Sequence, residues 1–180
     1  MKNKLLFFCI VILLSTFSCT RLLFLEKTKD FTLQNMSNKD YSNFNFTKGI
    51  FKDAKLNNSI FNYADFRESD FTNADLSYSI LKYSDLRNSK LKGSDLFSAD
   101  LSYCNLENLD FSNLNLSNVD FSGADLSSAN FTNSTLTGAV FNGAILNHAN
   151  FTNATVELNQ LFNGKSLIKT IMPYGTVFKK

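Results

Sequence analysis

The chain has 180 residues, enough for one domain with short appendages. Its net charge of +2, from 18 basic and 16 acidic side chains, excludes the strongly basic class of nucleic-acid binders. There is no Trp, and Pro173 is the single proline. The three cysteines show neither the spacing of a disulfide framework nor that of a metal site.

Residues 1–18 are typical of an export signal. Two lysines precede an apolar run over residues 5–14, and small residues follow before Cys19. The run is too short to span a bilayer, and Arg21 interrupts its continuation. The segment resembles a bacterial lipoprotein signal, which implies that Cys19 becomes the lipidated first residue of the mature chain. Cleavage elsewhere and an uncleaved anchor are the alternatives.

A lipid on Cys19 implies a protein anchored to a membrane of the bacterial cell envelope, with the inner and outer membranes not distinguished. Residues 19–43 are predicted to form a tether and a degenerate first coil. In that segment Phe31, Met36 and Tyr41 keep the five-residue register described next. The residues two before each of them are Lys29, Gln34 and Lys39, where the register calls for a small side chain.

A period of five residues dominates the chain from Phe51 to Val156. Every fifth residue is Leu or Phe, and only the last is Val. A small side chain stands two before nearly all of them, as Ala54 stands before Leu56. Helices have a period of 3.6 residues and strands a period of two, so this pattern predicts neither.

These quintets resemble the pentapeptide-repeat family, whose unit reads Ala-Asp/Asn-Leu/Phe-x-x, as in the segment 64–66. The resemblance implies an all-β solenoid, a right-handed quadrilateral β-helix over residues 44–156. The central Leu or Phe and the small residue would point inward. Residues twenty apart form self-similar columns such as Leu56, Leu76 and Leu96, which supports four quintets per coil.

Three successive quintets carry a larger side chain at the small inward position. These exceptions are Leu109, Leu114 and Val119. Because the bore of such a coil is narrow, we expect the coil to widen locally there.

Residues 157–180 are predicted to form a C-terminal cap that closes the solenoid. A short amphipathic helix is expected over 155–164, with Asn163 and Gly164 as its stop. An apolar strand and a Pro-x-Gly turn follow over 167–175. Helix and strand together resemble the cap of many members of the family.

The repeat leaves little for catalysis. His148 is the only histidine and falls at an outward position, while Cys104 falls at a small inward position and is expected to be a small buried hydrophobe. The sequence therefore predicts no enzyme, no catalytic, cofactor-binding or metal-binding residue, and no small-molecule substrate or nucleic-acid partner. Function is expected from the outward positions.

Charge divides unevenly along the repeat. Residues 44–92 mix basic and acidic side chains, whereas residues 93–164 contain seven acidic side chains and no Lys or Arg. The family includes gyrase-binding quinolone-resistance proteins that resemble DNA in shape and charge. A cytoplasmic DNA mimic is therefore the alternative to an exported scaffold, and an acidic face that only keeps the rod soluble is the simpler interpretation.

One face carries a sharper feature, which we call the tyrosine face. Three tyrosines are twenty residues apart at one outward position, with two isoleucines beside them and a further tyrosine near the preceding corner. The tyrosine face comprises Ile60, Tyr63, Tyr78, Ile80, Tyr83 and Tyr103. Contiguous exposed apolar surface of this kind indicates contact with a protein partner or with a second copy of the chain. The alternative is a ladder that only stiffens the sheet.

Overall fold

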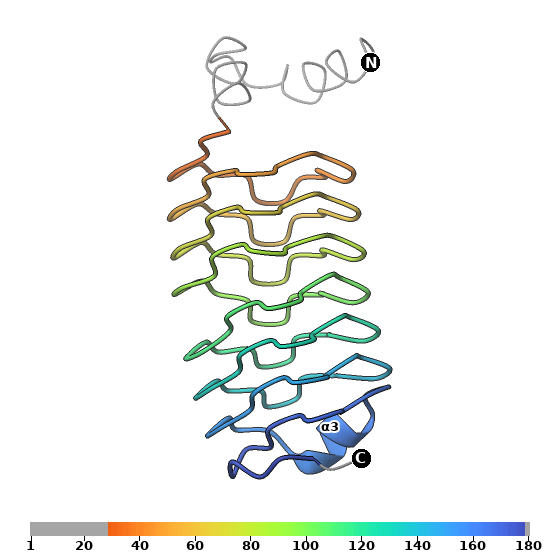
Figure 1. Ribbon diagram of the computed structural model, residues 1–180. Helices are drawn as coiled ribbons and strands as arrows, with labels where there is room; N and C mark the ends of the chain where they lie inside the picture. The colour runs from red at the N-terminus through yellow and green to blue at the C-terminus, as the bar shows by residue number, and fades with distance from the viewer. Residues whose placement is uncertain (1–28, 179–180) are drawn as a thin grey trace, which may run out of the picture. The chain divides into compact units, whose positions relative to one another are not determined.

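The structure is a computed structural model and describes residues 29–178. From Phe31 onward the chain winds into coils that stack on one another (Figure 1). Parallel β-bridges join residues twenty apart, from Asn35–Lys55 to Thr135–Thr155, so one coil takes four quintets. The chain is the predicted β-solenoid of five-residue repeats, and the right hand of its coil stays a prediction from the family resemblance.

The central residues form the core of the solenoid. Those from Phe51 to Phe151 are buried, and Val156 at the end of the register is half-buried. The rings of Phe111, Phe131 and Phe151 stack with centroids 5.0 and 4.7 Å apart. This is the spacing of neighbouring strands, about 4.8 Å, so like residues stack directly from coil to coil.

The Asp or Asn before each central residue closes the corner of its own quintet. Asp75 Oδ1, for example, accepts the Ser77 N–H at 3.0 Å and the Ser77 hydroxyl at 2.6 Å. Such bonds to the backbone two residues on are a main reason why Asp and Asn favour turns. The abundance of acidic side chains therefore follows from corner geometry and needs no active site.

The ladder begins at Phe31, before the boundary expected at residue 44. The Phe31 N–H donates to the Ile50 carbonyl at 2.7 Å, and the Tyr41 N–H donates to the Ile60 carbonyl at 2.7 Å. Residues 31–43 therefore have the backbone of a coil. The coil remains irregular inside, because Gln34 is half-buried and Lys39 is exposed.

At the other end the helix α3, Leu158–Phe162, takes the place of one quintet (Figure 1). Glu157 and Gln160 form a capping box at its N-terminus. The helix is shorter than the predicted span and ends at the predicted Asn163. Leu161 continues the five-residue register into the helix and is buried.

Beyond α3 the chain returns to the coil with its register shifted by one residue. Ser166 and Ile171 bridge to Ile145 and Asn150, which lie twenty-one residues earlier. Ile171 also pairs antiparallel with Val177, so a hairpin lies at the predicted Pro-x-Gly turn. This hairpin occupies the free edge of the last coil.

The backbone ladder is interrupted at one level, in the green part of Figure 1. Bridges join Asp85 to Asn105 and Asp100 to Asp120, but the structure describes none between residues 90 and 110 or between 95 and 115. Leu109 lies one residue before that break and is buried. The break coincides with the two inward leucines, 109 and 114, where the coil is expected to widen.

The ladder stays closed at Val119, the third of these residues. The Asp120 N–H still donates to the Ala99 carbonyl at 3.0 Å although Val119 is buried. Val is one carbon shorter than Leu, and the coil accommodates it without losing the ladder.

Cys104 does more than fill space. Its Sγ lies 2.9 Å from the Leu81 carbonyl oxygen and donates a hydrogen bond to it. Ser84, twenty residues earlier, donates its hydroxyl to the Phe61 carbonyl at 2.7 Å in the same way. Cys104 therefore acts as a serine equivalent, and burial raises the pKa of its thiol to about 12.

This burial predicts a loss of stability in alkaline solution. The unfolded chain releases the thiol proton near pH 9.0, whereas the folded chain keeps it to about pH 12. The unfolded state then binds fewer protons, so the free energy of unfolding falls as pH rises above 9, by up to about 1.4 kcal/mol per pH unit. Urea unfolding at pH 7 and pH 10 should show a larger loss in the parent than in Cys104→Ser. An equal loss in both proteins would contradict this.

Candidate functional site

The tyrosine face is built on corners of the coil. Each quintet turns through two corner residues, and the second has a positive φ, usually with Asn or Gly at that position. Those residues tolerate the left-handed region, whereas a bulky side chain there is strained. Tyr63, Tyr78, Tyr83 and Tyr103 nevertheless occupy it, with φ between 58° and 62°.

Three of these tyrosines form a stacked ladder. The ring centroids of Tyr63 and Tyr83 are 4.8 Å apart, those of Tyr83 and Tyr103 are 4.9 Å apart, and the planes are nearly parallel. Their exposed fractions are 58%, 47% and 54%. The ladder ends at Gly123, where an added Cβ would lie 2.6 Å from two ring atoms of Tyr103.

The two isoleucines lie side by side on the flat part of the same face. A parallel bridge joins Ile60 to Ile80, which is 36% exposed. The same column continues to Asp40 on one side and to Asp100 on the other. Lys82 Nζ contacts Asp100 Oδ2 at 3.0 Å, and this hydrogen bond raises the pKa of Lys82. An aliphatic strip is thus bounded by carboxylates at both ends.

Tyr78 stands at the corner where this face begins and is not part of the ladder. Its ring meets Phe97 edge-on, with centroids 5.5 Å apart. Sequence reasoning missed Phe97, although it falls in the coil directly after Tyr78. The twenty-residue coil could have pointed to Phe97, because residues about twenty apart lie side by side in this fold.

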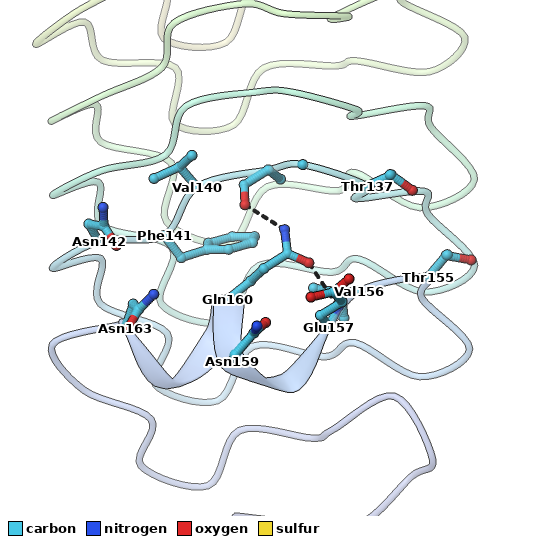
Figure 2. Close-up of a pocket in the computed structure, with 12 residues that line it drawn as sticks. Thr137, Val140, Phe141, Asn142, Thr155, Val156, Glu157, Asn159, Gln160 and Asn163 are labelled. Atoms are coloured by element: carbon cyan, nitrogen blue, oxygen red, sulfur yellow. Dashed lines mark hydrogen bonds between the residues drawn. The ribbon is translucent and has the colours of Figure 1, made fainter.

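Elsewhere the structure offers little for chemistry. His148 is exposed, and residues 29–178 contain no group of three His, Cys, Asp or Glu side chains that could hold a metal ion. A cavity of about 580 Å³ separates α3 from the coil before it (Figure 2). Gln160 crosses it to donate to the Ala139 carbonyl at 2.6 Å, and Glu157 is its one titratable side chain.

The lipidation candidate Cys19 lies outside the described residues. Over the part of the chain that the structure describes, no helix has the length and apolarity needed to cross a bilayer.

The ion pairs of the described structure, like the basic side chains of the repeat, lie in the N-terminal half of the solenoid. In the N-terminal half, Arg67 and Asp65 meet at 2.6 Å, and this contact lowers the pKa of Asp65 to about 2. Arg87 pairs with Asp85 at the same distance one coil later. Among the acidic residues of 93–164, only Asp100 has an ion pair in the described structure.

Comparison with known proteins agrees with the repeat. Residues 64–141 match the family model of the pentapeptide repeat region. No curated protein sequence matches the chain.

Solved structures of QnrB1, a plasmid-mediated fluoroquinolone resistance protein, are similar in fold. A trypsin-treated variant gives a TM-score of 0.59 and 23% identity over 69% of this chain and 66% of that one, just under two thirds of its length. The full-length protein gives 0.54 and 20% identity over 76% and 79%. At these identities the likeness concerns the fold alone. The five-residue register, the twenty-residue coil and the matching family model together identify residues 64–141 as a pentapeptide repeat region.

Proposed function

We propose that this chain is a non-enzymatic scaffold of the bacterial cell envelope that presents its tyrosine face to a protein partner. The observation that carries the proposal is the placement of bulky, exposed tyrosines at corners where the backbone favours Asn or Gly. Strained positions that persist at one place are a reason to suspect function.

A contribution to stability alone does not explain the stacked tyrosines. Holding a side chain with a Cβ in the left-handed region costs about 1–2 kcal/mol per residue. An aromatic pair contributes about 0.5–1.5 kcal/mol beyond its buried area. Three strained tyrosines, 63, 83 and 103, share two stacked pairs. The stacking therefore offsets only part of the strain, which argues against a ladder that serves stiffness alone.

The chemistry of the face favours a protein over a lipid surface. Ile60 and Ile80 make a flat aliphatic strip, and tyrosines of this kind supply contact area with little loss of conformational entropy. Asp40 ends the strip on one side and would be repelled by anionic lipid head groups, while on the other side Asp100 is paired with Lys82. A partner with its own apolar strip fits this surface.

Lipid attachment at Cys19 would hold the scaffold on the membrane. It is supported by the basic, apolar and small-residue order of residues 1–18 and by the short apolar run. The anchor would belong to the N-terminal end of the chain and leave the outward positions of the coils for contact.

A second candidate is a cytoplasmic DNA mimic that binds gyrase. One observation favours it: in residues 93–164 six of the seven acidic side chains have no ion pair in the described structure. The likeness of the fold to a fluoroquinolone resistance protein is compatible with it.

Site-specific photo-crosslinking tests the contact surface. A photoreactive phenylalanine at Tyr83 or Tyr63 in cells should capture one and the same partner. The same group at Asn133, an exposed corner residue on another face, serves as the matched control and should not capture it. Capture of a second copy of the chain would show self-association instead, and equal capture at Asn133 would contradict a specific face.

The double variant Ile80→Ser/Tyr83→Ser should abolish this capture. Because both side chains are at least one-third exposed, we expect the free energy of unfolding to change by no more than about 2 kcal/mol. If the double variant is less stable but still captures the partner, the contact proposal is wrong.

Metabolic labelling with palmitate separates the two candidate functions. The parent chain should incorporate label and fractionate with membranes, and Cys19→Ala should do neither. An unlabelled protein found in the cytoplasm would overturn the envelope scaffold and leave the DNA mimic, whose gyrase binding can then be assayed directly.

A further inference from the structure

The break in the backbone ladder leaves polar groups facing one another across two coils. In the regular part of the solenoid, Phe71 and Leu76 donate their N–H groups to the carbonyls of residues 90 and 95 in the next coil, each at 2.8 Å. Twenty residues later the equivalent bonds are missing in the described structure. The backbone donors left without one are those of Asn88, Leu91, Gly93, Leu96, Asp110 and Asn115.

The break affects two faces of the coil and spares the other two. On one spared face the Leu86 N–H donates to the Asn105 carbonyl at 3.0 Å. On the other the Leu101 N–H donates to the Asp120 carbonyl at 2.8 Å. The opening is therefore a wedge, closed along two adjacent faces.

Both coils that border the wedge are regular on their far sides. The Lys90 N–H donates to the Ser69 carbonyl at 2.8 Å, and the Asn130 N–H donates to the Leu109 carbonyl at 2.8 Å. The solenoid thus consists of two intact stacks, residues 31–105 and 106–178, that meet at one incomplete level.

A buried side chain at the same level is also unsatisfied. Ser89 is 9% exposed, and its hydroxyl has no hydrogen-bond partner within the described protein. Ser69, twenty residues earlier, donates its hydroxyl to the Phe46 carbonyl of the coil before it at 2.8 Å, and Ser89 makes no such bond on that side either. Buried backbone and hydroxyl groups in native proteins are almost always paired with protein or with ordered water. Water is the partner that fits a row of such groups between two coils.

We propose that this level is a hydrated hinge, in which water bridges the two coils and the stacks bend about the two closed faces. Leu109 and Leu114 hold it open, because a leucine at the small inward position separates the coil from the one before it. The hinge does not depend on the identity of any partner of the tyrosine face.

Amide hydrogen exchange measured by NMR on the full chain tests the hydration directly. Asn88, Leu91, Gly93 and Leu96 should exchange on the order of 100-fold faster than the residues twenty before each, because their amides need no opening of the ladder. Glu68, Phe71, Asn73 and Leu76 are those controls, and each donates to the next coil. Equal protection of the two sets would overturn the proposal.

Substitution tests the cause. In Leu109→Ala/Leu114→Ala the ladder should close, and the four fast amides should slow toward their controls. Val119→Ala is the matched control, because the ladder is already intact beside Val119, and it should leave those amides unchanged. If the double variant is folded and the four amides stay fast, or if Val119→Ala slows them as well, the leucines do not hold the hinge open. If the double variant fails to fold, the exchange rates of the parent still decide whether the level is hydrated.

Bending is tested by pulsed electron paramagnetic resonance. Spin labels on Asp53→Cys and Asn133→Cys would straddle the hinge along one exposed corner column. The distance distribution should be broader in the parent than in the variant with the two alanines. Equally narrow distributions in both proteins would contradict a hinge.

Discussion

The size of the side chain two residues before each central Leu or Phe decides whether neighbouring coils can close their backbone ladder. Where that residue is Ala, Ser or Cys, its coil lies at strand spacing from the coil before it and the N–H and C=O groups between them are paired, as beside Ser84, where the Asp85 N–H donates to the Ala64 carbonyl. Where it is Leu, at 109 and 114, the ladder opens on two faces. The core stacking, the corner turns and the regular outer columns all depend on this one limit on volume.

The same limit separates what builds the solenoid from what is free to vary. The inward positions are fixed by packing, and where Asp or Asn precedes a centre its side chain bonds to the corner, as Asp75 shows. The corner residues are constrained only by their positive φ, which Asn and Gly adopt with the least strain. Several corners carry other residues, such as Lys48, Glu68 and His148, but only the tyrosines at 63, 83 and 103 stack into a ladder in the described structure.

Sequence periodicity was enough to predict the coil, its four quintets and its buried columns, because a registered repeat constrains packing at every level at once. It also located the weak level at Leu109. It did not predict that Val119 would be accommodated, that Cys104 would replace a serine hydroxyl, or that Phe97 would join Tyr78. Those outcomes depend on distances of a few tenths of an ångström and on contacts between columns, which a period of five does not contain.

Substitution at Ala124 tests the volume limit most directly. Ala124 is buried, and beside it the Asp125 N–H donates to the Cys104 carbonyl at 3.0 Å and the Leu106 N–H donates to the Asp125 carbonyl at 2.9 Å. In Ala124→Leu these two amides should lose their protection from hydrogen exchange, while those of distant coils keep it. Ala124→Val should retain the protection, as the native coil does beside Val119. A folded Ala124→Leu protein with both amides as protected as in the parent would contradict the account.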